Sequence, residues 1–348
     1  MGYPLTDLPA LIAGGFDTII DVRTPAEFAE DHVPGAVNMP VLSNEERAEV
    51  GTIYVQESPF KARKIGATRV ARNAATAIET HLLDNEGGWR PLVYCWRGGQ
   101  RSGSFTTILQ QIGWRAQVLE GGYQSWRRHV VAQLYDTTLP FKVIRLDGYT
   151  GTAKTALLGR VARLGGQVLD LEGLAKHRGS ILGDIDGVQP AQKGFETALL
   201  ETLSALDPTK PLLIEAESAR IGTIRLPPAL WNAMKDSPRI EVEATPHHRA
   251  RFLATAYKDL AADAPALTTR LNHLRPLAGH KTVEKWLSLL NANQTQALAH
   301  ALISEHYDPA YARLIRSKTA PPIATIDAGD LSDRALNAAA AQIARLLT

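Results

Sequence analysis

The chain of 348 residues contains a single cysteine, Cys95, in a segment that favours a reactive thiol. An apolar run over residues 91–94 precedes it, and glycines and arginines follow it as far as Arg101. This order predicts a buried strand, a tight loop and a helix that begins near Ser102. The N–H groups of such a loop and a nearby arginine lower the pKa of a thiol. A lone cysteine can also be a small buried core residue, and that alternative stays open.

A second segment has the residue types of a phosphate-binding loop. The strand predicted over residues 141–146 runs into a loop in which backbone N–H groups and a lysine hold two linked phosphates. Ala153 stands where the pattern has glycine, and we expect its Cβ to narrow the space beside the phosphates and to disfavour NTP hydrolysis. A glycine-bearing turn without ligand is the alternative. The predicted phosphate-binding residues are Gly148, Thr150, Gly151, Thr152, Lys154 and Thr155.

A carboxylate ends one of the strands that we expect beside this loop. Glu215 closes the apolar run over residues 211–215, the position of a metal-orienting acid in phosphate-loop proteins. The hydroxyl of Thr155 reaches a metal in the same pattern, so the two residues form a candidate Mg²⁺ site. Strand-end carboxylates often serve only as helix caps, which is the alternative for Glu215.

Acidic and basic residues also gather at the end of the strand predicted over residues 167–171. Asp170 and Glu172 flank this end, and Lys176 and Arg178 follow shortly after. We expect the two basic side chains to face phosphate, with the acids organising them. A cluster of surface salt bridges is the alternative.

The composition is that of a soluble globular chain, with 45% hydrophobic and 21% charged residues and a net charge of +2. We expect a cytoplasmic protein without a membrane segment, because no apolar run is long enough to span a bilayer and the N-terminus does not read as a signal peptide. One cysteine excludes an internal disulfide and a zinc site built on several thiolates. Local basic clusters are each typical of a solvated face, but several together would bind a polyanion. They are residues 61–64, 127–129, 176–178 and 247–251.

The order of strand and helix signals predicts two α/β domains. The first covers residues 1–136 and the second residues 137–348. Within the second, residues 246–318 are mostly helical and interrupt the strand pattern before a last strand near residue 324. The predicted fold class is therefore α/β, with a parallel-sheet phosphate-loop domain that carries a helical C-terminal subdomain.

Residues 1–136 resemble the rhodanese domain, on the evidence of Asp21-Val22-Arg23, residues 27–28 and residues 32–40, followed by the cysteine loop. A rhodanese domain joined directly to a P-loop domain resembles the tRNA 2-selenouridine synthases. The resemblance spans nearly the whole chain. Further segments that fit this family are residues 64–67, 95–102, 120–123, 170–180, 215–218 and 307–311.

This resemblance implies a two-stage modification of the wobble uridine in the tRNAs that read Lys, Glu and Gln codons. Geranyl diphosphate first alkylates the sulfur of 2-thiouridine. Selenium from selenophosphate then replaces the geranylthio group and leaves 2-selenouridine. The family implies no tightly bound organic cofactor, and Mg²⁺ is expected only beside the diphosphate.

The resemblance also assigns roles to residues of the first domain. Cys95 would carry selenium as an S-selanylcysteine intermediate, and Gly66 is a further position implicated in selenation. Arg97, Arg101 and the loop amides, at Gly98 and Gly99 among others, would bind selenophosphate.

Other functions remain open at this stage. The seven residues from Cys95 to Arg101 match the loop length of phosphatases built on the rhodanese scaffold. A sulfurtransferase or phosphatase with a regulatory P-loop NTPase domain is one alternative, and a P-loop kinase or NTPase with a rhodanese sensor is another. A tRNA-binding module with a vestigial thiol is the non-enzymatic alternative.

Overall fold

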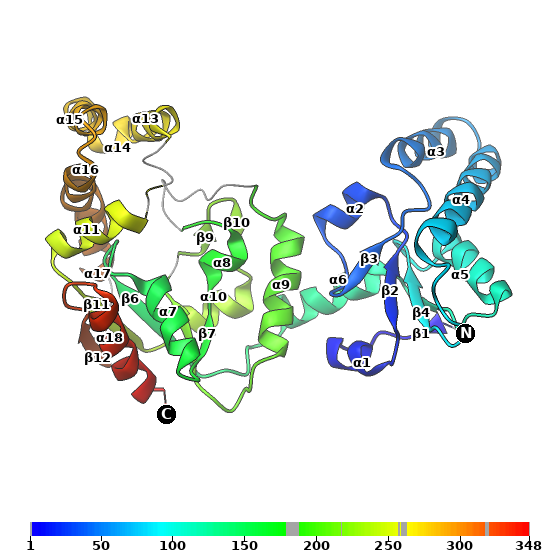
Figure 1. Cartoon of the computed structure of the whole chain (residues 1–348), viewed down its shortest axis with the longest axis horizontal. Helices are drawn as coiled ribbons and strands as arrows, with labels where there is room; N and C mark the ends of the chain where they lie inside the picture. Colours follow the sequence, from blue (N-terminus) through cyan, green and yellow to red (C-terminus); the bar gives the residue numbers. More distant parts are fainter. Residues whose placement is uncertain are drawn as a thin grey trace. The chain divides into compact units, whose positions relative to one another are not determined.

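The computed structural model describes residues 2–178, 188–216, 218–256, 258, 263–316 and 320–347. Contacts between Cα atoms divide the chain into two compact units (Figure 1). The first unit comprises Met1–Thr137 and Pro190–Ala205, and the second comprises Thr138–Gln189 and Leu206–Thr348. Residues 179, 180 and 217, which belong to segments quoted above, lie outside the described residues.

The first unit is built on a parallel five-stranded sheet in the order β1-β5-β4-β2-β3. All four residues of its middle strand β4 are buried, as expected for a parallel strand covered on both faces. The apolar run over residues 91–94 forms β4, as predicted. The strands are β1 (Gly2–Tyr3), β2 (Thr18–Asp21), β3 (Ala36–Asn38), β4 (Pro91–Tyr94) and β5 (Gln117–Leu119).

Helices cover both faces of this sheet (Figure 1). Val70 of α4 and Phe105 of α5 pack with Val93 in one hydrophobic cluster. Helix α2 starts at Pro25, because Thr24 caps it in a reciprocal capping box with Glu27. The helices are α1 (Leu8–Ala13), α2 (Pro25–Glu30), α3 (Asn44–Gln56), α4 (Pro59–His81), α5 (Gln100–Ile112), α6 (Tyr123–Val131), the π-helical turn η1 (Ala132–Asp136) and α9 (Gln192–Ser204).

Helix α9 returns to the first unit from a later part of the chain. Trp126 of α6 donates its ring N–H to the hydroxyl of Thr197, 3.2 Å away. Arg127 forms an ion pair with the fully buried carboxylate of Glu196, which also accepts a hydrogen bond from Tyr135. A buried charge needs such partners, so this polar cluster fixes α9 against α6 and η1.

An ion pair is buried at the carboxyl edge of the first sheet. Arg23 is 1% exposed and donates to both carboxylate oxygens of Asp21, at 3.1 and 2.6 Å. Its guanidinium also donates to the carbonyl of Asp31 at 2.6 Å and lies 4.0 Å from the ring centre of Tyr123. The pair thus ties the end of β2 to the loop before β3 and to the start of α6.

The second unit contains a parallel five-stranded sheet in the order β12-β11-β6-β8-β7. The central strand β6 lies between β8 and β11, so its carboxyl end faces strand ends on both sides. A short antiparallel pair, β9 with β10, stands apart from the sheet. The strands are β6 (Val143–Gly148), β7 (Gln167–Leu169), β8 (Leu212–Glu215), β9 (Arg220–Ile221), β10 (Ile224–Arg225), β11 (Arg239–Glu243) and β12 (Ala324–Asp327).

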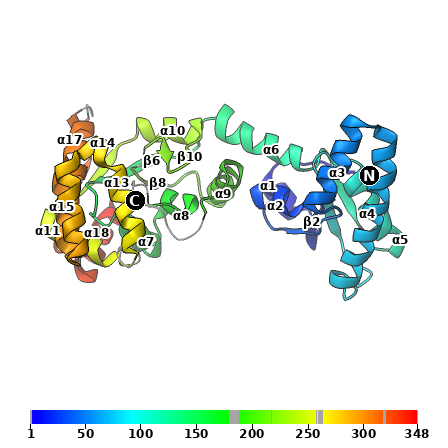
Figure 2. The same ribbon diagram turned by 90° about the horizontal axis from the view of Figure 1, so that it is seen from above.

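Helices α7 and α18 pack on one face of this sheet, where Leu157 and Leu336 share a cluster with Val242. A separate cluster around Trp286 and Leu271 holds the helices that lie together at one end of this unit (Figure 2). The helices are α7 (Lys154–Arg163), α8 (Leu171–Ala175), α10 (Pro228–Lys235), α11 (Pro246–Ala256), α13 (Ala264–His273), α14 (Arg275–Ala278), α15 (His280–Asn291), α16 (Thr295–Leu302), the π-helical turn η2 (Ile303–Tyr307), α17 (Asp308–Arg316) and α18 (Asp333–Arg345). Among the described residues, none of the helices has the length and apolar character needed to cross a bilayer.

Removal of Asp21 tests the buried ion pair. Asp21→Ala leaves the guanidinium of Arg23 buried without its carboxylate, and we expect the free energy of unfolding to fall by about 3–5 kcal/mol. Urea unfolding of the full chain measures this change. The control is Glu49→Ala, which breaks an exposed pair with Arg69 and should cost less than about 1 kcal/mol. Equal effects of the two substitutions would contradict the role given to the buried pair.

Candidate active sites

The thiol of Cys95 lies at the carboxyl end of β4 and is 4% exposed. Its sulfur accepts a hydrogen bond from the hydroxyl of Ser102, 3.1 Å away. Burial acts to raise the pKa of Cys95, but hydrogen bonds from Ser102 and from the N–H groups of Ser102 and Arg97, together with the charge of Arg101, lower it overall. These contacts favour the thiolate form of Cys95, with Ser102 as the principal donor.

The shape of the cysteine loop depends on backbone packing against residues 120–123. Gly98 has φ +67°, and a Cβ there would lie 2.8 Å from the carbonyl oxygen of Leu119. Gly122 has φ +57°, and a Cβ there would lie 2.3 Å from the carbonyl oxygen of Cys95. The N–H of Tyr123 donates to that same oxygen at 2.8 Å. With this carbonyl bound on the far side, N–H groups of the loop are directed at the sulfur.

The two arginines of the loop are placed differently. Arg101, in the first turn of α5, donates to both carboxylate oxygens of Glu27, at 2.9 and 3.4 Å. Arg97 is exposed on the loop. Gly99 is the N-cap of α5 and is exposed at the helix N-terminus. Arg101 therefore acts on the thiol through its charge, while two of its five N–H donors engage Glu27.

Gly66 lies in the middle of α4 rather than in the cysteine loop. The nearest atom to a Cβ built there is a methyl carbon of Val50 in α3, at 3.5 Å. This glycine belongs to the packing between α3 and α4, two helices that lie side by side in Figures 1 and 2.

The second site is the loop between β6 and α7, which the sequence predicted to bind phosphate. Gly148 has φ +152°, and a Cβ there would lie 2.6 Å from the carbonyl oxygen of Val242. Gly151 has φ +87°, and a Cβ there would lie 3.0 Å from the side chain of Leu253. Thr152 is buried and donates from both its N–H and its hydroxyl to the carbonyl of Tyr149. Thr152 thus closes the loop on itself.

Ala153 adopts the left-handed backbone conformation, with φ +61°. Glycine reaches this region freely, whereas alanine pays about 1–2 kcal/mol. Ala153 is buried and belongs to the hydrophobic cluster with Leu157 and Val161. Its methyl group packs with that core, so the expected narrowing of the space beside the phosphates does not follow. The replacement of glycine by Ala153 instead strains the backbone.

Four side chains of the predicted site converge at the start of α7. Lys154 donates from Nζ to the carbonyl of Gly148 at 3.0 Å. Thr155 donates to Glu172 at 2.9 Å and lies 3.3 Å from an oxygen of the buried Glu215. Burial raises the pKa of Glu172, while Thr155 and the charges of Lys154 and Arg178 oppose that shift.

This donor set fits Mg²⁺. The cation prefers oxygen ligands, and the structure brings together the hydroxyl of Thr155 and the carboxylates of Glu172 and Glu215. The described residues contain no group of three or more His, Cys, Asp or Glu side chains suited to a metal. A cation here would therefore need phosphate oxygens or water to complete its shell, as Mg²⁺ commonly does.

The two basic residues predicted beyond β7 are placed differently. Arg178 lies close enough to Glu172 for its charge to act on that carboxylate. Lys176 is the C-cap of α8, has a left-handed backbone with φ +48° and an exposed side chain. Arg178 therefore joins the site around Thr155, whereas Lys176 primarily ends the helix.

The C-terminal helical region reaches the phosphate loop through an arginine. Arg249 of α11 is 3% exposed and forms a two-point ion pair with Asp308 of α17, at 2.9 and 2.7 Å. The same guanidinium donates to the carbonyl of Thr150 at 3.1 Å and lies 5.2 Å from the ring centre of Tyr149. Arg249 thus holds the loop by its backbone and by a ring.

Tyr311, one turn further along α17, contacts the same loop. Its hydroxyl donates to the buried carboxylate of Asp147 and accepts from the N–H of Gly148 at 3.0 Å. Burial, and then the negative charge of Asp147, raise the pKa of Tyr311 well above its usual range. Its ring lies 4.6 Å from that of Tyr149, centre to centre. Tyr311 therefore holds the loop at Gly148, and Asp308 holds it at Thr150 through Arg249.

Sequence reasoning placed Arg249 only in the basic cluster 247–251 and gave no role to Asp308 or Tyr311. Residues 307–311 fit the family pattern, but nothing local indicated what they contact. Glu172 was expected to organise basic residues, and it follows the end of β7 by three residues, at the edge where parallel sheets place their ligands. Ser102 was noted only as a helix start; it lies in the first turn of α5, and no local signal marked it as a donor to the sulfur.

Comparisons with known proteins agree with this architecture. A family model described as the tRNA 2-selenouridine synthase AAA domain matches residues 141–270. Another, described as the rhodanese-like domain, matches residues 5–129. The predicted fold class is confirmed: an N-terminal rhodanese domain precedes a P-loop-like AAA domain, both with parallel sheets, and a helical C-terminal region follows.

Three relatives carry the name tRNA 2-selenouridine synthase. The one from Alcanivorax borkumensis is 31% identical over 327 residues, which are 84% of this chain and 88% of the relative. The one from Hahella chejuensis is 31% identical over 338 residues, which are 86% of each chain. The one from Nitrosomonas europaea is 35% identical over 244 residues, which are 69% of this chain but 63% of that relative, less than two thirds of its length.

Alkylation of the single cysteine tests the activation of its thiol. Ser102→Ala removes the hydroxyl that donates to the sulfur, so we expect the pKa of Cys95 to rise and the iodoacetamide rate at neutral pH to fall severalfold. The rate is followed against pH by mass spectrometry of the intact protein. Ser104→Ala, at an exposed serine of the same helix, is the control and should react as the wild type does. An unchanged pH profile of the alkylation rate in Ser102→Ala would show that Ser102 does not lower the pKa of Cys95.

Replacement of Arg249 tests its hold on the phosphate loop. Arg249→Ala frees the carbonyl of Thr150 and leaves Asp308 unpaired, so we expect affinity for inorganic diphosphate to fall about tenfold or more. Isothermal titration calorimetry of the full chain measures the loss. Arg249→Lys should recover only part of it, because lysine lacks the fork that engages both oxygens of Asp308. Arg251→Ala, at an exposed position in the same helix, is the control, and an equal loss there would contradict the proposal.

Proposed function

Because the chain belongs to the tRNA 2-selenouridine synthase family, we propose that it exchanges the sulfur of a wobble 2-thiouridine for selenium in two stages. The observation that carries this proposal is the presence of an activated thiol loop in one unit and a phosphate loop in the other. Each loop suits one stage. The substrates are the tRNAs that read Lys, Glu and Gln codons, together with geranyl diphosphate and selenophosphate.

In the first stage the sulfur of 2-thiouridine attacks C1 of geranyl diphosphate. A carbon–sulfur bond forms, the carbon–oxygen bond to diphosphate breaks, and the base loses its N3 proton. Lys154 and the amides at the start of α7 stabilise the charge that develops on the leaving diphosphate. Lys154 now bonds to a neutral carbonyl, that of Gly148, and a charged phosphate oxygen is the stronger acceptor.

Magnesium has a place in this stage. The hydroxyl of Thr155 and the carboxylates of Glu172 and Glu215 would hold the ion next to the phosphates. Bound there, Mg²⁺ would neutralise part of the diphosphate charge. The residues themselves keep the two carboxylates oriented, because Glu215 also accepts the backbone N–H of Glu172 at 2.9 Å.

In the second stage selenium replaces the geranylthio group. S-alkylation has turned a poor leaving group into a thiolate that departs readily. The overall change consumes selenophosphate and water, releases phosphate and geranylthiol, and leaves selenium bound to C2 of the base. Cys95 acts in this stage beside selenophosphate, and its thiol is regenerated, so that the exchange at C2 involves no net oxidation or reduction. The lowered pKa keeps its sulfur in the thiolate form, which is the reactive one.

Arg101 keeps donors for an anion at Cys95. Glu27 takes two of the five N–H donors of its guanidinium, at 2.9 and 3.4 Å. The other three remain for the oxygens of selenophosphate.

Substitution of one residue in each loop separates the stages. We expect Cys95→Ser to abolish selenation and to leave S-geranylation largely intact, because the thiol enters only the second stage. Lys154→Ala should instead lower S-geranylation at least about tenfold, since it removes a charged contact to the leaving group. Nucleosides from 2-thiouridine tRNA, incubated with geranyl diphosphate and then selenophosphate, are identified by mass spectrometry.

Lys210→Ala is the matched control for the lysine, because Lys210 is largely exposed and lies outside the phosphate loop. It should behave as the wild type does in both stages. Supply of pre-geranylated tRNA should bypass Lys154→Ala but not Cys95→Ser. Loss of both stages in both variants would refute this division of labour.

A further inference from the structure

Helices α3 and α4 form a hairpin whose tip exposes large apolar side chains. Tyr54 and Val55, near the end of α3, are 55% and 83% exposed. Phe60, in the first turn of α4, is 63% exposed. Scattered apolar residues are normal on a surface, but three within seven positions at one turn form a patch that suits a partner. We call these three residues and the adjacent Arg63 and Lys64 the hairpin tip.

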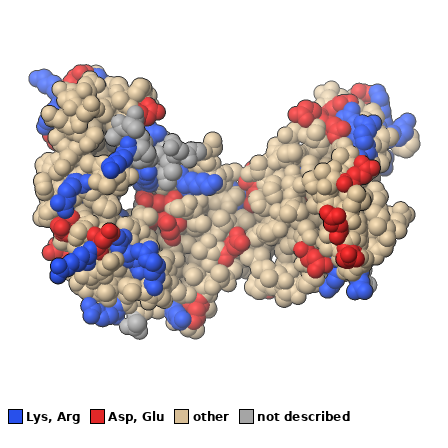
Figure 3. Space-filling view, viewed as in Figure 1, with Lys and Arg blue, Asp and Glu red and all other residues tan. Residues whose placement is uncertain are grey.

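Two cations surround the aromatic ring of this tip. The ammonium of Lys64 lies 5.1 Å from the ring centre of Phe60, and the guanidinium of Arg63 lies 6.0 Å from it. Both side chains are exposed, and Lys and Arg gather over this hairpin in the space-filling view (Figure 3). A flat ring beside exposed positive charges matches the two needs of a nucleotide, stacking for the base and charge for the phosphate.

The acidic residues of the hairpin do not cancel this charge. Glu57 pairs with Lys61, and Glu49 pairs with Arg69. Over the described parts of the chain, the ion pairs found include none to Arg63 or Lys64. The positive charge at the tip is therefore available to an external polyanion.

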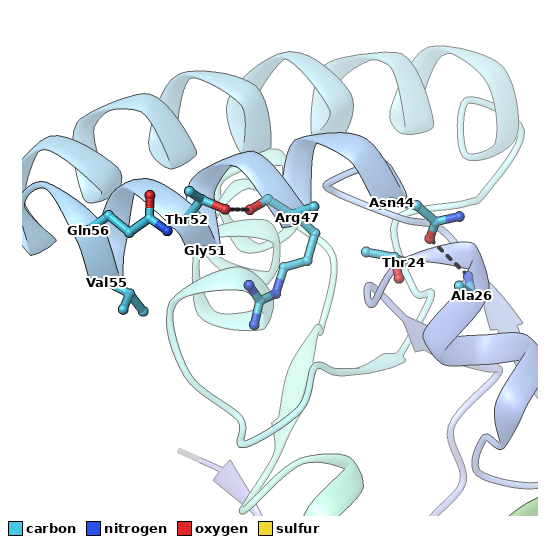
Figure 4. A pocket seen from close by; sticks show the side chains of 9 residues that line it. Thr24, Ala26, Asn44, Arg47, Gly51, Thr52, Val55 and Gln56 are labelled. Carbon is cyan, nitrogen blue, oxygen red and sulfur yellow. Dashed lines mark hydrogen bonds between the residues drawn. The ribbon is translucent and has the colours of Figure 1, made fainter.

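A pocket lies along this hairpin, between the start of α2 and one side of α3. It has a volume of about 510 Å³. Its lining includes Thr24, Gly51 and Val55, and Arg47 extends into it from α3 (Figure 4). Because Val55 belongs to the hairpin tip, the pocket adjoins the tip and adds the cation of Arg47 to it.

We propose that the α3–α4 hairpin is the RNA-docking arm of the rhodanese unit. The hairpin tip stacks an unpaired base on Phe60 and binds backbone phosphates through Arg63 and Lys64. Arg47 takes a further phosphate in the adjoining pocket. This inference rests on the proposed function, because it names the surface that presents the tRNA to the second stage.

Single-stranded RNA is the occupant that the charge favours. A second copy of this chain would bring the same positive tip against itself and would be repelled. An acidic protein would satisfy the cations but would not require a flat ring beside them. Unpaired RNA loops satisfy both features, since their splayed bases stack on aromatic side chains.

Binding of an anticodon stem-loop RNA that carries 2-thiouridine tests the proposal. The full chain is titrated into the labelled RNA at several KCl concentrations, and fluorescence anisotropy gives the dissociation constant. Phe60→Ala should weaken binding by roughly 5- to 150-fold, the effect of losing one stacked base. The double variant Arg63→Ala/Lys64→Ala should reduce the slope of log affinity against log salt by about 1.4, or about 0.7 per phosphate.

Matched controls lie on the same unit, away from the hairpin tip. Leu83→Ala removes an apolar side chain that is 70% exposed, and Arg115→Ala removes an exposed charge. Both should bind the RNA within twofold of the wild type. Circular dichroism of each variant establishes that it is folded. The proposal is overturned if the tip variants bind as the controls do, or if the free protein is a dimer that Phe60→Ala dissociates.

The nucleoside assay separates this proposal from the proposed function. With saturating RNA the tip variants should give the same selenation rate as the wild type, because only the RNA concentration needed for half-maximal rate rises. A wild-type chain that binds the RNA through the tip but yields neither modified nucleoside would overturn the proposed function and leave the docking surface standing. Full activity of the tip variants at low RNA concentration would overturn the docking surface and leave the proposed function standing.

Discussion

A positive charge buried at the carboxyl edge of a sheet must find compensation, and the geometry around Cys95 follows from how Arg23 is compensated. Its guanidinium takes both oxygens of Asp21 at the end of β2 and lies against the ring of Tyr123. Tyr123 is thereby fixed at the start of α6, where its N–H binds the carbonyl of Cys95. With that carbonyl held outward, the N–H groups of the loop point at the sulfur. A charge that never touches the thiol therefore sets the orientation of the dipoles that activate it.

In the second unit, the phosphate loop is likewise held in shape by contacts from distant residues, here from later segments of the chain. A phosphate loop without ligand exposes several N–H groups and needs external support to keep its curvature. Arg249 supplies it at the carbonyl of Thr150, and Tyr311 supplies it at the N–H of Gly148. Both supports come from the helical C-terminal region, and Asp308 connects them by holding Arg249. The helical region thus supports the curvature of the loop. This support explains how Ala153 keeps its strained left-handed backbone, which an isolated loop would relax.

The sequence predicts those parts of the structure whose signals are local. Apolar runs located β4 in the first sheet and β6, β7 and β8 in the second, because hydrophobic burial of a strand is encoded within a few residues. Contacts that join distant segments left no such trace. Arg249 and Asp308 are 59 positions apart, and Gly148 and Tyr311 are 163 apart, so no periodicity or spacing relates them. The direction of the Ala153 methyl group was likewise hidden, because it depends on the core that packs around it rather than on the motif.

The balance of forces at Cys95 also bears on which chemistry the loop can sustain. Apart from burial, which opposes ionisation, the leading influences on the pKa of Cys95 are hydrogen bonds, and the charge of Arg101 follows them. Because Glu27 pairs with Arg101, the loop stabilises a thiolate mainly by oriented dipoles. Glu27 takes only two of the five N–H donors of Arg101, and Arg97 is exposed on the same loop. The loop can therefore lower the pKa of its thiol through dipoles and still offer charged donors to an anion beside the sulfur.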